Sequence, residues 1–248
     1  MNFEERIQKF NDLIKNSKNI VFLGGAGVST ESGLPDFRGK NGLYNTHDVK
    51  FDKYSPEFLL SRDCLYKKSN VFYEYYRQKL DFRNYFPNIT HKVLAIMESK
   101  GKMSSIITQN IDGLHQKAGS KTVYEIHGTI SKNYCRKCRK IFDENFIFEN
   151  QDPIPRCECG GMVRPNIVLY GEQLPYDELN SASNAIAEAD LIIVGGTSLT
   201  TYPTANLIPT WGSHAKLVII NREKTFLDDK CEVRFFEDLG EVFSKIEY

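Results

Sequence analysis

The stretch IVFLGGAGVSTESGLPDFRG, residues 20–39, decides the fold. Its first four residues form a continuous apolar run that ends in glycines, which is typical of a buried parallel strand. Gly25 and Gly27 let the backbone turn tightly and approach a pyrophosphate. The segment from Val28 to Ser32 can begin a helix whose free N–H groups face phosphates. The sequence therefore predicts a strand followed by a nucleotide-binding loop.

This loop departs from the dinucleotide fingerprint G-x-G-x-x-G, because Thr30 stands where the third glycine is expected. No acidic residue that could take a ribose closes a second strand about 20 residues later. Pro35-Asp36-Phe37-Arg38 adds a rigid turn, an acid, an aromatic ring to cover a flat group and a base for a phosphate. We predict a nucleotide site without ordinary hydride-transfer geometry. A glycine-rich turn that only connects two elements is the alternative.

Similar apolar runs recur along the chain at residues 105–108, 191–195 and 216–220. Helix-like patterns occupy residues 90–100 and 176–189 between them, and apolar residues at helical spacing open the chain. Strands that alternate with helices predict an α/β fold, a Rossmann-like parallel sheet with helices on both faces.

Two stretches interrupt this alternation. Residues 41–84 are aromatic and charged, with a helix-prone part at 56–80, and residues 131–163 are polar and hold four cysteines. We interpret both as insertions that form a second, smaller lobe. The rest forms the large lobe. Its predicted segments are residues 1–40, 85–130 and 164–248.

The overall composition excludes some classes of partner. The 248 residues include 32 basic and 32 acidic side chains, so no net charge attracts nucleic acid or an anionic membrane. No apolar run approaches the roughly 20 residues of a membrane span. The N-terminal segment MNFEERIQKF carries charges where an export signal needs an apolar core. We therefore expect a cytoplasmic protein without specific nucleic-acid or membrane binding.

A second polar segment, TQNIDGLH at residues 108–115, follows another predicted strand. Ligands bind at the carboxyl ends of strands in open α/β sheets, and Asn110 and Asp112 offer groups for a ribose and a carboxamide. A turn stabilised by the same two side chains is the alternative. His127 is followed by glycine and is a candidate general base, since histidine accepts protons near neutral pH. A lone histidine is nevertheless more often structural.

The cysteines form the pattern C-x2-C-x18-C-x-C at positions 135, 138, 157 and 159. Four thiolates at close to this spacing typically hold a zinc ion, and they close its coordination shell. We predict one structural Zn2+ bound by Cys135, Cys138, Cys157 and Cys159. Redox catalysis is the alternative, but a thioredoxin-like site uses a single C-x-x-C.

Taken together, these segments resemble the sirtuin family of NAD-dependent protein-lysine deacylases. The matching segments are GAGVSTESGLPDFRG (25–39), TQNIDGLH (108–115), HG (127–128), the four cysteines, RPNIVLYGE (164–172), GTSLTTYP (196–203) and Asn221. The resemblance covers nearly the whole chain in order and spacing. It implies a catalytic core with a large Rossmann-like lobe and a small lobe made of a zinc-binding module and a helical module. Acyl-lysine would enter the cleft between the two lobes.

The resemblance also implies roles for individual residues. In the first loop, NAD would contact Gly25, Ala26, Gly27, Thr30, Asp36, Phe37 and Arg38. The nicotinamide and its ribose would lie near Gln109, Asn110, Ile111, Asp112 and His127. The adenosine side would lie near Gly196, Thr197, Ser198, Asn221, Arg222 and Asp238. His127, Asn110 and Asp112 would be catalytic. The substrate peptide would pair as a β-strand with Val168, Leu169, Tyr170 and Gly171.

The implied reaction explains why no serine or cysteine nucleophile is apparent. In the family, the acyl oxygen of the substrate attacks the nicotinamide ribose and expels nicotinamide. Free lysine and O-acyl-ADP-ribose follow, with His127 as the base. An ADP-ribosyltransferase, a non-catalytic NAD or zinc module and a dehydrogenase are the alternatives.

The acyl preference depends on the helical insertion. Relatives that remove succinyl or malonyl groups carry Tyr-x-x-Arg there, whereas this chain has Tyr73 and then Tyr76 at the arginine position. Arg77 is adjacent, but on a helix it points about 100° away. We place both tyrosines in the substrate site and favour acetyl over acidic acyl groups, with desuccinylase or demalonylase specificity as the alternative. The expected partners are acylated proteins or peptides, and a monomer is favoured.

Overall fold

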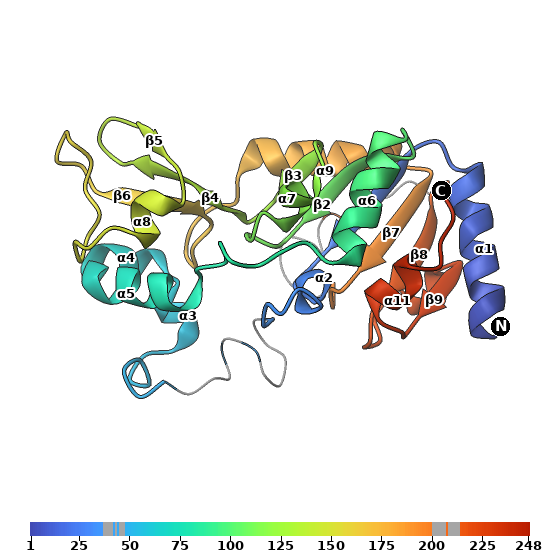
Figure 1. The fold of residues 1–248 in the computed structure, drawn as a ribbon, viewed down its shortest axis with the longest axis horizontal. Coiled ribbons are helices and arrows are strands. Elements are labelled where there is room, and N and C mark those ends of the chain that lie inside the picture. Colours follow the sequence, from blue (N-terminus) through green and yellow to red (C-terminus); the bar gives the residue numbers. More distant parts are fainter. Residues whose placement is uncertain (37–41, 43, 45–47, 200–206, 208–213) are drawn as a thin grey trace.

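The computed structural model describes residues 1–36, 42, 44, 48–199, 207 and 214–248. Its main element is a parallel sheet of six strands in the order β3-β2-β1-β7-β8-β9 (Figure 1). The strands are β1 (Ile20–Gly24), β2 (Met103–Thr108), β3 (Val123–Glu125), β7 (Leu191–Gly195), β8 (Lys216–Ile220) and β9 (Val233–Phe235). The predicted Rossmann-like sheet is confirmed, and the strand order reverses between β1 and β7. Ligands bind at such a switch point.

Helices cover both faces of this sheet, as predicted. One face packs against α1 (Phe3–Asn16), α6 (Ile89–Ser99) and α11 (Leu239–Phe243), and the other packs against α9 (Tyr176–Glu188). Strand β1 shows why its sequence is continuously apolar. Phe22 belongs to the core under the first group of helices and Leu23 to the core under α9, because successive side chains point to opposite faces.

Local sequence signals fix the helix that opens the chain. The backbone N–H of Glu5 donates to the side chain of Asn2, and the backbone N–H of Asn2 donates to the carboxylate of Glu5, both at 2.9 Å. This capping box satisfies two N–H groups that lack helical partners. The apolar stripe of α1 is then buried on the sheet.

A second, smaller sheet lies at the other end of the molecule (Figure 1). Strands β4 (Gly128–Cys135), β5 (Ile141–Phe142) and β6 (Val163–Ile167) are antiparallel, in the order β5-β4-β6. The neighbouring helices are α3 (Pro56–Leu59), α4 (Arg62–Lys67), α5 (Ser69–Lys79) and α8 (Asn145–Phe148). These elements share one hydrophobic core. Strands β4 and β6 each cross a predicted lobe boundary, at residues 130/131 and 163/164. The exact boundaries of the two lobes stay a prediction.

The remaining elements are short. They are α2 (Gly27–Thr30), α7 (Leu114–Ala118) and the 3-10 helix η2 (Asp228–Lys230). The helix expected after the glycine loop, from Val28 to Ser32, is present as α2. It is a single turn that ends at Thr30. Among the described residues, no helix is long and apolar enough to span a membrane.

Candidate functional site

A cavity of about 790 Å³ lies at the carboxyl ends of β1, β2, β7 and β8, at the switch point of the sheet. It extends to the segment that follows β6. The sequence-predicted residues that line it are Ala26, Gly27, Thr30, Asp36, Gln109, Asn110, Ile111, His127, Val168, Leu169, Tyr170, Gly171, Gly196, Thr197, Ser198, Asn221, Arg222 and Asp238. Phe37 and Arg38 lie outside the described residues. The fold thus collects in one place residues from most of the predicted loops.

The glycine loop is in contact with the loop that follows β7. The backbone N–H of Gly25 donates to Gly195 O at 3.1 Å, and that of Gly27 donates to Gly196 O at 2.9 Å. A Cβ atom on Gly27 would lie 2.6 Å from Gly196 Cα, which is closer than real Cβ contacts. Gly25 does not line the cavity itself but packs against Thr197. Glycine is required here because the two backbones touch.

Asn110 and Asp112 are joined by a residue that the sequence interpretation missed. The hydroxyl of Ser29 donates to Asp112 Oδ2 at 2.7 Å and accepts from Asn110 Nδ2 at 3.0 Å. Asp112 also accepts from the backbone N–H of Leu114 at 2.8 Å. All three polar side chains are buried, and burial raises the pKa of the Asp112 carboxyl. Asp112 therefore lies behind the cavity wall, where it orients Ser29 and, through it, Asn110.

His127 lines the cavity at the start of β4. Its Nδ1 lies 2.9 Å from the carbonyl oxygen of Gln109. A carbonyl oxygen only accepts hydrogen bonds, so Nδ1 carries the proton and the lone pair is on Nε2. This tautomer suits a general base.

The segment after β6 is held firmly at the cavity wall. Val168 N–H donates to His127 O at 2.9 Å, and Tyr170 N–H donates to Leu60 O at 3.0 Å. The buried guanidinium of Arg164 forms a two-pronged ion pair with Glu172, and the same carboxylate accepts from Leu169 N–H at 3.1 Å. Residues 168–170 are thus held in place at the cavity wall, and a turn closed by Glu172 N–H and Leu169 O at 2.9 Å follows at Gly171.

Tyr73 and Tyr76 do not reach the cavity, in contrast to the expectation that they contact substrate. Both are fully buried in the core of the small lobe. The Tyr73 hydroxyl donates to Val163 O at 2.7 Å, and the Tyr76 ring stacks on Phe148 with ring centroids 5.2 Å apart. Helix α5 turns this face toward the small sheet and α8. Burial also raises the pKa of both hydroxyls above their ordinary range.

Other lining residues were not among the predicted site residues. They are Glu31, Tyr44, Leu60, Ile167, Glu172, Leu174, Ile220, Glu223, Glu237 and Leu239. Glu31, Ile167 and Glu172 lie within quoted segments, and Ile220 and Glu223 lie close to Asn221, so their place in the sequence is the available signal. The others come to the cavity through tertiary packing.

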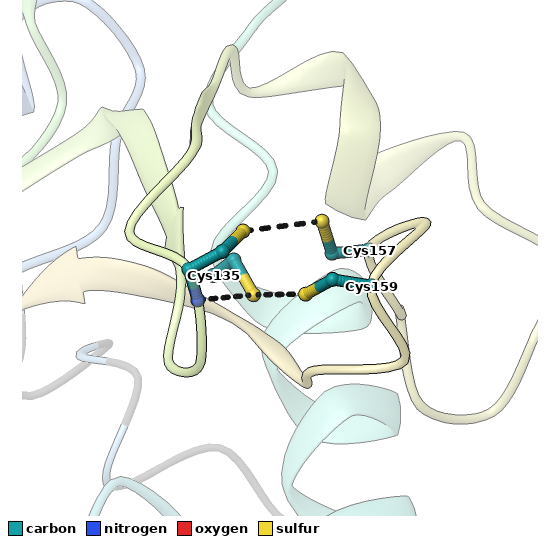
Figure 2. A group of neighbouring side chains, drawn as sticks. Cys135, Cys157 and Cys159 are labelled. Atoms are coloured by element: carbon teal, nitrogen blue, oxygen red, sulfur yellow. Dashed lines mark hydrogen bonds between the residues drawn. The ribbon is translucent and has the colours of Figure 1, made fainter.

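The four predicted zinc ligands meet at one point of the small lobe. Their Sγ atoms all lie within 4.8 Å of one another, with 3.4 Å between Cys135 and Cys159 and 3.6 Å between Cys138 and Cys157. Figure 2 shows the labelled sulfurs turned toward a common centre. A tetrahedral zinc with Zn–S bonds of about 2.3 Å needs sulfurs about 3.8 Å apart, so these residues fit the ion.

The backbone around the cysteines supports this arrangement. The N–H groups of Lys137 and Cys138 point at Cys135 Sγ, at 3.4 and 3.5 Å. A Cβ atom on Gly161 would lie 2.5 Å from the same sulfur. Gly161, the second glycine after the C-x-C pair, therefore leaves room for the thiolate of Cys135.

Comparisons with known proteins agree on the family. The Sir2 family model matches residues 25–203. A protein of Clostridium tetani named NAD-dependent protein deacetylase is 46% identical, with 96% of each chain covered. One of the same name from Clostridium perfringens is 45% identical, covering 98% of this chain and 99% of the relative.

Solved structures give the same result. A structure concerned with the structural basis of sirtuin substrate affinity has a TM-score of 0.88 and 38% identity, covering 99% of this chain and 98% of that one. A structure of Sir2 with a p53 peptide and NAD+ has a TM-score of 0.83 and 36% identity, covering 96% of each chain. The sequence motifs, the fold, the cavity and these likenesses all lead to one conclusion: the chain belongs to the Sir2 family, the sirtuins.

Proposed function

We propose that this chain is an NAD-dependent protein deacylase that removes acetyl groups from lysine side chains and releases nicotinamide and O-acyl-ADP-ribose. The observation that supports this most is one cavity lined together by the glycine loop, Asn110, His127 and residues 168–171. The curated relatives named NAD-dependent protein deacetylase span almost the whole chain. A structural relative, Sir2 bound to acetylated peptide, has a TM-score of 0.84 and 35% identity, covering 96% of each chain.

The residues that line the cavity have different roles in this proposal, according to the part of NAD that each would contact. When bound, NAD supplies a glycosidic carbon that accepts the acyl oxygen and a nicotinamide that leaves. Ala26, Gly27 and Thr30 hold its phosphates at the switch point of the sheet. Asn110, oriented through Ser29, aligns the nicotinamide ribose. Because these groups are already in place, they would stabilise the charge that develops on the ribose in the transition state without reorganising during the reaction.

His127 is the general base in this proposal. Its Nδ1–H donates a hydrogen bond to Gln109 O, so the proton of a ribose hydroxyl in the cavity is accepted by Nε2. The substrate peptide adds as a strand beside residues 168–171, which main-chain hydrogen bonds recognise independently of sequence. Their fixed path lowers the entropy lost on binding.

The described residues do not form the arrangement that would favour an acidic acyl group. Arg77 Nε donates to Ile147 O at 2.9 Å and Arg77 Nη2 to Asp152 O at 2.8 Å, so its guanidinium is used to hold the small lobe together. Tyr76, at the position of the recognition arginine, is neutral and buried. We therefore propose acetyl or other neutral acyl groups as the preferred substrates.

The four cysteines bind one structural zinc ion and carry no step of the reaction. Their four thiolates leave no open coordination position for substrate or water. We further propose that the protein acts on acylated proteins in the cytoplasm as a monomer, without binding nucleic acid or membrane. The balanced charge of the chain supports the last point.

The decisive test measures nicotinamide release with NAD, with and without an acetyl-lysine peptide. Release that depends on the peptide, together with free lysine, is expected. His127→Ala is expected to abolish turnover while NAD binding by calorimetry is retained. His214→Ala, an exposed histidine that does not line the cavity, is the matched control. Transfer of label from NAD to protein without deacylation would instead identify an ADP-ribosyltransferase.

A further inference from the structure

Two arginines on the surface of the small lobe pack against one aromatic ring. Arg62 opens α4, and Arg136 lies between the zinc ligands Cys135 and Cys138. The guanidinium carbons of Arg136 and Arg62 lie 4.2 and 5.9 Å from the centre of the Tyr66 ring. A guanidinium packed on a ring keeps its charge, and its N–H groups stay available for a carboxylate. These three side chains, the arginine cluster, therefore present two positive charges that are already oriented.

Neither charge of the arginine cluster is neutralised within the described part of the chain. Both guanidinium groups are exposed, and neither forms an ion pair or a hydrogen bond with a described residue. Asp63, the acidic neighbour of Arg62, pairs instead with Lys67 at 2.7 Å. Glu158 pairs with Lys140 at 3.2 Å. The arginine cluster thus turns two cations toward solvent, where an acidic ligand can reach them.

The backbone places the arginine cluster beside the cavity. Arg62 N–H donates to Tyr170 O at 2.9 Å, and Tyr170 N–H donates to Leu60 O at 3.0 Å. Tyr170 and Leu60 line the cavity, and Tyr170 belongs to the segment that we propose binds the substrate peptide. An extended peptide advances about 3.3 Å per residue, so side chains within a few positions of a bound acyl-lysine come within reach of Arg62.

We propose that the arginine cluster selects acylated protein segments that carry aspartate or glutamate close to the acyl-lysine, on the flank that passes Tyr170. A carboxylate pairs with a guanidinium through two parallel hydrogen bonds. An acidic side chain at this place therefore adds to binding, and a lysine or arginine is repelled. The inference rests on the proposed function, because it names the substrate class of that same cavity.

The test compares kcat/KM for acetyl-lysine peptides of equal length. One flank of the acetyl-lysine carries neutral residues, glutamates or lysines, and a second set places the same residues on the other flank. On one flank, the glutamate peptide is expected to exceed the neutral peptide about fivefold, mainly through KM, and the lysine peptide to fall below it. The preference should fade at about 0.5 M salt, because screening weakens attraction between exposed charges.

Variants assign the preference to the arginine cluster. Arg62→Gln combined with Arg136→Gln is expected to remove the preference for glutamate. Arg62→Glu, which lies outside the zinc-binding turn, is expected to reverse it, so that the lysine peptide becomes the better substrate. Lys92→Gln combined with Lys121→Gln is the matched control, since both lysines are exposed and neither lines the cavity. This control removes the same charge and should keep the preference.

A binding measurement keeps this inference separate from the proposed function. Fluorescence anisotropy with labelled acetyl-lysine peptides, in the absence of NAD, needs no turnover and should give the same order of Kd values. Failure to deacetylate any peptide contradicts the proposed function, whereas turnover of the neutral peptide without a charge preference overturns only the inference. Equal Kd values for glutamate and lysine peptides overturn it too. So does a preference that persists in the double arginine variant or disappears equally in the control.

Discussion

Ser29 is the residue on which the geometry of the catalytic loop depends. Its hydroxyl connects Asn110 and Asp112, which lie about 80 positions away in the chain. All three side chains are buried, so the network is shielded from competing water. Removing the hydroxyl leaves a buried carboxylate and a buried amide without this partner.

Ser29→Ala is therefore expected to lower the free energy of unfolding by about 2 kcal/mol and kcat about tenfold or more, with a smaller effect on NAD binding. Denaturant unfolding and steady-state kinetics measure both. Ser32→Ala is the matched control, because the buried Ser32 hydroxyl has no hydrogen-bond partner among the described groups. If the two variants behave alike, the network has no special role.

Two further buried histidines make stability depend on pH. The rings of His91 and His115 lie 4.7 Å apart, both fully buried. Burial lowers the pKa of His91 from 6.5 to about 4 and that of His115 well below 6.5. The unfolded chain binds protons below pH 6.5 while the folded chain does not. Stability is thus complete above pH 6.5 and is lost as the pH falls toward 4.

His91 alone accounts for about 3 kcal/mol over that interval. His115→Leu is expected to flatten the dependence between pH 7.5 and 4.5 and to cost little at neutral pH, because neither ring nitrogen has a hydrogen-bond partner among the described groups. Urea unfolding across this range measures it, with the exposed His214→Leu as control. An unchanged slope contradicts the assignment.

Among the elements, the segment after β6, which we propose binds the substrate peptide, is held in place by an ion pair. Arg164 and Glu172 form a nearly buried ion pair, with side-chain exposures of 5% and 17%, and Glu172 also accepts Leu169 N–H. Breaking such a pair leaves a charge without its partner. The segment would then lose its fixed path.

Glu172→Gln is accordingly expected to destabilise the protein by about 3 kcal/mol and to raise KM for the peptide severalfold, with KM for NAD nearly unchanged. Thermal unfolding and kinetics with the peptide varied provide the measurement. Glu232→Gln, in an exposed pair with Lys9, is the control and should be neutral. A parallel rise in both KM values would show a general effect on the cavity.

The sequence predicts elements well where their apolar runs are long. The runs at β1, β2, β7 and β8 carry enough consecutive buried residues to identify strands. β3 and β9 have three residues each, too few for a pattern, and they are strands because they pair with a neighbour. The helix-prone insertion divides into short helices, two of which begin at the capping side chains of Ser55 and Ser61.

Some residues of the candidate site could also be predicted from the sequence, and others could not. Residues within motifs, such as Asn110 and His127, were predicted to line the cavity and do so. Tyr73 and Tyr76 were predicted to contact substrate because they match the Tyr-x-x-Arg positions of some relatives. The packing of α5 instead determines that they face the core. Ser29 and Glu31 act through partners distant in sequence, and no local pattern marks such partners.

For the molecule as a whole, the cavity is lined by both the large sheet and the segment beyond β6. A ligand there stabilises the folded state because only that state presents the cavity. NAD at about 100 times its Kd adds about 2.7 kcal/mol, a rise of several degrees in Tm. Differential scanning fluorimetry measures this, and a constant Tm over the titration would mean that NAD does not bind the folded chain.

The contact between Gly27 and Gly196 has an evolutionary consequence. The backbone of each glycine leaves no room for a side chain on the other glycine. A Cβ atom added to either one would lie 2.6 Å from the backbone of its partner. No second-site change can relieve that clash, because the obstructing atoms are main chain and every amino acid carries them. In a selection for active variants from a library randomised at both codons, glycine alone should survive at each position. We therefore expect purifying selection on both codons, whichever acyl group, peptide or partner the enzyme acts on.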